Sequence, residues 1–147
     1  MARPAADIAR DFLAVLWDSP APDEATLSRA LDRLLFLSHE VPSEDCAEED
    51  LDPPSVDGPS LYREVASRFP DLSMYPVADP LGPIDEETTL ADAIDDIADL
   101  TRDLREVVWR AENLGSNDAA WYFRLMYFHW ATHARRLGMY LHARQSG

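Results

Sequence analysis

The chain has 147 residues, of which 13 are basic, 28 are acidic and 46% are hydrophobic, and its formal net charge is −15. This length and apolar content are enough for one domain with a core, and we predict that residues 1–147 form a single domain. The charge excludes nucleic-acid binding and disfavours docking on anionic lipid, because both need clustered basic residues.

The single cysteine, the absence of lysine and the N-terminal sequence exclude further classes of protein. The single cysteine, Cys46, can form neither an internal disulfide nor a cysteine-based zinc site, and its acidic neighbours oppose thiolate formation. All basic residues are arginine, which excludes Schiff-base lysine chemistry and a Walker-type phosphate loop. Charges within residues 7–11 interrupt any signal peptide, and no apolar run is long enough to cross a membrane. We therefore expect a cytoplasmic protein.

The first half of the chain shows helical periodicity without an alternating strand pattern. Helices are predicted over about residues 5–17, 23–41 and 60–69. Two prolines at positions 20 and 22 separate the first two helices. Residues 42–60 carry seven acidic residues and no basic one, which predicts a solvated acidic loop. A calcium loop is not predicted, because the spaced ladder of oxygen ligands is missing.

The second half contains the strongest helical pattern. Residues 70–83 hold four prolines among aromatic and aliphatic residues, which predicts an ordered loop against the core. Apolar positions then keep heptad spacing through residues 89–114, and Gly115 favours a tight turn into a last helix over about residues 116–143. The stripe consists of Leu90, Ile94, Ile97, Thr101, Leu104, Val108 and Ala111. The predicted fold is an all-α bundle of about five helices, with a long C-terminal antiparallel αα-hairpin at its centre.

Three segments of the chain carry a resemblance to a known family. They are Phe69–Pro80, the aspartate-rich Thr89–Leu104, and a tryptophan-rich stretch from Trp121 to His142 that contains His-Trp-x-x-His. In combination they resemble the bacterial family named Domain of Unknown Function 5063. The resemblance implies a compact helical domain and no particular reaction.

Two histidines of the last helix form the first candidate site. His129 and His133 are four residues apart, so both imidazoles leave one face of a helix, with about 6 Å between their β-carbons. Zinc- and iron-binding helices present two nitrogens in this way. Buried histidines with hydrogen-bonded nitrogens are the simpler interpretation, because no Glu follows His129 as in zinc proteases. No metal is predicted, and a divalent transition metal is the alternative.

An aspartate cluster on the predicted helix 89–114 is the second candidate. Its members are Asp92, Asp95, Asp96, Asp99 and Asp103. The order Asp-Asp-x-x-Asp resembles a Mg²⁺-diphosphate motif, but the acids centre about 180° from the apolar stripe of the same helix. We therefore predict a solvated face that points away from His129 and His133. A metal site would then need other acids, for which Asp7, Asp11 and Asp32 are the candidates.

These observations favour a non-enzymatic module that binds a protein partner or associates with itself through apolar surface. The alternative is a metal-binding helical-bundle protein, or a metal-dependent enzyme, that uses His129 and His133. No catalytic or cofactor-binding residue is predicted, because no Gly-x-Ser-x-Gly or similar nucleophile motif occurs.

Overall fold

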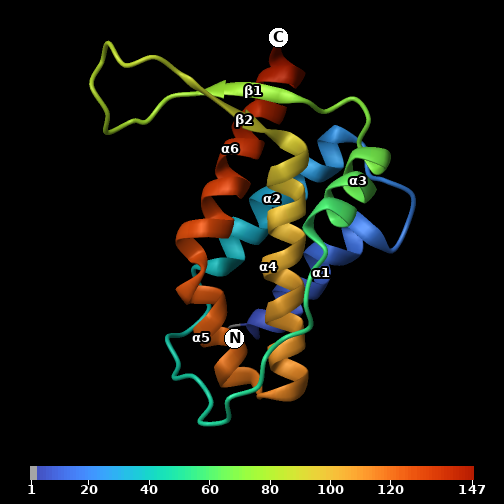
Figure 1. Ribbon diagram of the computed structural model, residues 1–147, viewed down its shortest axis with the longest axis vertical. Helices are drawn as coiled ribbons and strands as arrows, with labels where there is room; N and C mark the ends of the chain where they lie inside the picture. Colours follow the sequence, from blue (N-terminus) through green and yellow to red (C-terminus); the bar gives the residue numbers. More distant parts are fainter. Residues whose placement is uncertain (1–2) are drawn as a thin grey trace.

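The structure is a computed structural model that describes residues 3–147, and these residues form six helices and one two-stranded sheet (Figure 1). The elements are α1 (Ala5–Trp17), α2 (Glu24–Ser38), α3 (Gly58–Arg68), β1 (Met74–Val77), β2 (Thr89–Asp92), α4 (Ala93–Asn113), α5 (Ser116–Leu125) and α6 (Tyr127–Ser146). The predicted helical fold is confirmed at this level. The sheet and the division of the last helix into two are the departures from prediction.

Aspartate side chains start three of the helices. The carboxylate of Asp23 accepts the backbone N–H of Thr26 at α2, and that of Asp57 accepts Ser60 N–H at α3. The Asp92 carboxylate accepts the backbone N–H of Ile94 and caps α4. Such caps satisfy N–H groups that have no partner within the helix. α4 begins at Ala93, four residues later than the apolar periodicity indicates.

The small sheet replaces part of the predicted loop and of the predicted fourth helix. β1 pairs antiparallel with β2, with Tyr75 opposite Ala91 and Pro76 opposite Leu90. Proline is tolerated here because each strand of a two-stranded sheet has a free edge. Leu90, predicted to lie in the apolar stripe, is 67% exposed on β2. Residues 74–77 and 89–92 are therefore strands rather than loop and helix.

Within the C-terminal hairpin predicted to lie at the centre, α4 is the helix with neighbours on several sides. α1, α3, α5 and α6 all pack against α4. As a result, Asp96 and Asp103 are buried, although both belong to the side predicted to be solvated. A helix with neighbours on several sides has no single solvent face.

The chain reverses direction after α4 and then interrupts its last helix once. Gly115 has a φ of 104°, a conformation that residues with a β-carbon rarely adopt, and it separates α4 from α5. The predicted helix 116–143 is broken at Met126 into α5 and α6. α6 then returns along α4 (Figure 1). Its other side packs on α2, whereas Phe128 and Met139 are exposed.

The acidic segment, residues 41–57, contains no helix or strand. Hydrogen bonds to α5 hold it to the bundle, and in one of them Arg124 donates to the backbone carbonyl oxygen of Val41 at 2.7 Å. The carboxylate of Asp118 on α5 accepts the backbone N–H of Ala47 at 3.0 Å and a hydrogen bond from Arg110 of α4 at 3.0 Å. Within residues 3–147, no helix combines the length and the hydropathy needed to cross a membrane.

Candidate metal centre

His133 of α6 lies between two carboxylates of α4. Its Nδ1 is 2.7 Å from Asp96 Oδ1, and its Nε2 is 3.0 Å from Asp99 Oδ2. Asp96 is 2% exposed, so its charge has little contact with water. Both ring nitrogens of His133 are therefore partnered by acids of the neighbouring helix.

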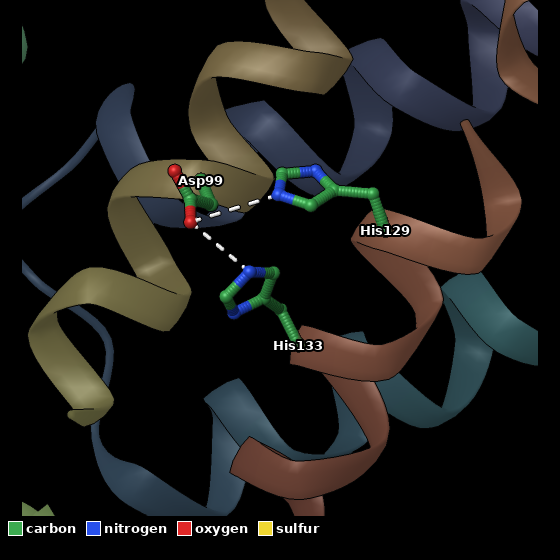
Figure 2. A group of neighbouring side chains, drawn as sticks. All are labelled: Asp99, His129 and His133. Carbon is green, nitrogen blue, oxygen red and sulfur yellow. Dashed lines mark ion pairs between the residues drawn. The ribbon is translucent and has the colours of Figure 1, made fainter. Parts of the chain in front are cut away.

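His129, one turn earlier on α6, repeats this arrangement. Its Nδ1 is 2.6 Å from Oδ2 of the buried Asp103, and its Nε2 is 3.8 Å from Asp99 Oδ2. Figure 2 shows the result: both imidazoles reach from α6 toward the one carboxylate of Asp99 on α4. One ligand-type atom from each of the three residues lies within 4.8 Å of the others.

The prediction that the aspartates of this helix point away from His129 and His133 is wrong for three of the five. Asp96, Asp99 and Asp103 all contact the histidines. Their i, i+3, i+7 spacing is itself that of one helix face, and the His-x-x-x-His spacing matches it on an antiparallel neighbour. This matching spacing is the feature of the sequence from which the aspartate–histidine contacts could be predicted. The angular position of the acids relative to the apolar stripe predicts solvation only for a helix with a single buried face, and α4 has several neighbours.

The other predicted acids stay outside the cluster. Asp92 caps α4, and Asp95 is exposed, although partial burial and the charge of Asp99 raise its pKa. Asp7 and Asp11 pair with arginines of the N-terminal region, and Asp32 lines a separate hollow beside His142. The structure brings none of these three to the histidines.

The carboxylate partners decide which histidine nitrogen is available as a ligand. An ionised carboxylate only accepts hydrogen bonds, so each Nδ1 bonded to an aspartate carries a proton. The Nε2 lone pair of a neutral ring is then left for another partner. In both His129 and His133 this atom is the one directed at Asp99.

Burial and hydrogen bonds shift the pKa values of several residues in the cluster. Burial lowers the pKa of His133, but hydrogen bonds with Asp96 and Asp99 outweigh it and raise the pKa to about 10. The hydrogen bond from His133 holds the pKa of Asp99 below its ordinary value, although burial opposes this. Burial raises the pKa of Asp103 despite the hydrogen bond with His129. The cluster thus binds a proton at His133 strongly.

Asp96 has a second hydrogen-bond partner besides His133, which is Tyr75. The hydroxyl of the buried Tyr75 on β1 donates to Asp96 Oδ2, on the oxygen that His133 does not use. The Tyr75 ring stacks on Tyr140 of α6, with centroids 4.5 Å apart and planes 12° apart. Tyr75, Asp96 and His133 therefore form one hydrogen-bonded chain that ends at Asp99.

The separations between Asp99 and the two histidines are compatible with a shared metal ion. Two ligands each about 2.1 Å from a tetrahedral ion lie about 3.4 Å apart. The separations from Asp99 Oδ2 to the two Nε2 atoms, 3.0 and 3.8 Å, lie on either side of that value. The side chains of Asp99, His129 and His133 are 26%, 34% and 20% exposed, so an ion and its remaining water ligands can reach them. Asp99 also lines a hollow of about 340 Å³ beside α3.

Comparison with known proteins gives the fold and no function. No family model matches the chain, and no curated protein matches it. The crystal structure of protein BF1032 from Bacteroides fragilis, a structural-genomics target, superposes with a TM-score of 0.71. The alignment covers 95% of this chain and 88% of that chain at 15% sequence identity. At this identity the similarity establishes a shared fold alone.

Proposed function

We propose that this protein binds a divalent transition metal ion through Asp99, His129 and His133. The observation that carries the proposal is the convergence of two Nε2 atoms on one carboxylate, with a second carboxylate on each Nδ1. Protein metal sites commonly use this carboxylate–histidine–metal arrangement, in which the outer carboxylate orients the ring and makes it a better donor. Two imidazoles and one carboxylate suit zinc and iron(II).

The predicted C-terminal antiparallel hairpin is part of this proposal. α4 and α6 supply all three ligands and the acids behind them, and the pairs Asp103–His129 and Asp96–His133 run in opposite chain directions. Three protein ligands leave at least one coordination position for water or another ligand, as in catalytic and sensor sites. The ion would take the place of the proton that His133 Nε2 shares with Asp99.

Metal titration of the chelator-treated protein tests the proposal. We expect one ion of Zn²⁺ or Fe²⁺ per chain by calorimetry, and a higher melting temperature when that ion is added. By mass action the stabilisation is about 2.7 kcal/mol at a hundredfold excess over the dissociation constant. Asp99→Asn, His129→Gln and His133→Gln should each remove this stabilisation.

Matched controls come from the exposed histidines His39 and His142. His39→Gln and His142→Gln should leave the metal response unchanged, because neither ring is in the cluster. An equal response in all five variants would mean that the acidic surface binds ions non-specifically. A wild type without any metal-dependent shift would leave the histidines as hydrogen-bonded structural residues and would contradict the proposal.

The remaining predictions from sequence are compatible with this site. A role in contacts with a protein partner or a second copy has support in the exposed apolar side chains of the β1–β2 hairpin and α6. A cytoplasmic location has support in the single unpaired Cys46. Membership of the Domain of Unknown Function 5063 family stays a prediction from the three resembling segments.

A further inference from the structure

The hairpin arm, residues 78–88, joins β1 to β2 and projects away from the helices (Figure 1). Leu81 and Ile84 in this arm are 95% and 106% exposed, so neither packs against the described chain. Acidic residues flank them, namely Asp79, Asp85, Glu86 and Glu87. The arm therefore presents apolar side chains within a negatively charged loop.

A groove of about 550 Å³ lies at the base of the arm, against the second half of α6. Its apolar lining includes Pro76, Val77, Pro80 and Met139. Arg135 and Arg136 also line it, and neither guanidinium has a carboxylate within 4.0 Å in residues 3–147. Arg135 donates instead to the hydroxyl of Tyr127 at 2.8 Å. The groove is thus apolar with unpaired positive charge, which is the complement of the arm.

We propose that a second copy of this chain occupies the groove, with the two arms exchanged. Leu81 and Ile84 of each copy pack on the apolar lining of the other, and the acids of the arm pair with Arg135 and Arg136. The arrangement is closed and two-fold symmetric, because each chain carries both the arm and the groove. The inference does not depend on the metal site, whose ligands lie outside the groove.

Size and electrostatics both permit such a dimer. The arm and the groove residues together number about 20, which is what one partner contributes to a standard interface. The net charge of −15 makes the two copies repel each other. At physiological ionic strength, however, charges more than about 8 Å apart are largely screened. Contacts between the arm and the arginines act at shorter range and are screened less.

The oligomeric state of the full chain, measured by sedimentation across a wide concentration range at physiological salt, tests the proposal. We expect a monomer–dimer equilibrium. Leu81→Ser/Ile84→Ser and Arg135→Glu/Arg136→Glu should each weaken dimerisation at least tenfold. Phe36→Ser and Arg63→Glu, which change an exposed apolar and an exposed basic residue elsewhere, should leave it unchanged. Circular dichroism checks that every variant is folded.

A charge exchange separates the specific contact from general adhesion of apolar surface. Adding Asp85→Arg/Glu86→Arg to the Arg135→Glu/Arg136→Glu variant should restore much of the dimer, because the complementary charges are then reversed. A wild type that is monomeric at every concentration overturns arm exchange. So does a dimer that the arm variants leave intact. Binding of dodecanoate to a monomeric wild type, lost with Arg135→Glu/Arg136→Glu, would also overturn it by assigning the groove to a small anionic amphiphile.

Discussion

Two acidic stretches of this chain have opposite environments. The acidic segment, residues 41–57, lies outside the helices, and its aspartates and glutamates have no histidine or arginine partner within 4.0 Å in residues 3–147. In α4, Asp96 and Asp103 are buried and bonded to histidines of α6. The sequence predicts that both stretches are solvated. The difference shows that acid density alone does not decide burial, which also depends on whether neighbouring helices, one of them with matching bases, pack against the acids.

The largest expected difference between the two stretches is in the free energy of unfolding. Asp96→Ala removes the buried acceptor of both Tyr75 and His133 and leaves the half-buried His133 ring with Asp99 as its remaining carboxylate partner. We expect a loss of about 3–5 kcal/mol, the range for breaking a buried ion pair from one side. Asp52→Ala in the acidic segment should change stability by no more than about 0.5 kcal/mol. Urea unfolding of the two variants measures both, and equal effects would contradict the assigned environments.

The pH dependence of stability should also come from the α4 cluster. The folded-state pKa of His133 is about 10, against about 6.5 in an unfolded chain. The stability that His133 contributes is therefore fully present below about pH 6.5 and is lost as the pH rises toward about 10. Thermal melts in the presence of a chelator should show a falling melting temperature across this window.

His133→Gln should remove most of this slope, because glutamine does not titrate there. A variant with Glu48 and Glu49 of the acidic segment changed to Gln should keep it. If the slope survived in His133→Gln, the raised pKa would belong to another group, and the electrostatic contrast between the two acidic stretches would be wrong.

A smaller difference in the free energy of unfolding is expected between two tyrosine–aspartate hydrogen bonds. Tyr75 donates to buried Asp96, whereas Tyr62 donates to Asp92 at the exposed start of α4. Tyr75→Phe should cost about 1–2 kcal/mol, since a buried carboxylate loses one donor. Tyr62→Phe should cost less than about 0.5 kcal/mol, because water replaces the donor. Tyr75→Phe should also weaken metal binding about tenfold, as changes in outer partners do.

Local features of the fold could be predicted, and features set by packing could not. The bounds of α1 and the turn at Gly115 follow from nearby residues alone. The sheet depends on pairing across an eleven-residue arm, and Leu90 continues the helical period of α4, so the pattern favoured helix there. The histidine pair was found from its spacing. Its aspartate partners were missed because their burial depends on how many helices surround α4.

The position of the acidic segment in the chain determines what happens when the backbone is cut within it. This segment is the single covalent link between α1–α2 and the rest of the described chain, and the contact of Ala47 with Asp118 lies near its first third. A protease that cuts at residues 48–57 would leave both fragments with their buried faces and the Ala47 contact intact. The cut removes the high effective concentration of one fragment near the other, which the covalent link provides. The two fragments, produced separately, should therefore reassemble into the same bundle by complementation, with the metal ligands all on the larger one.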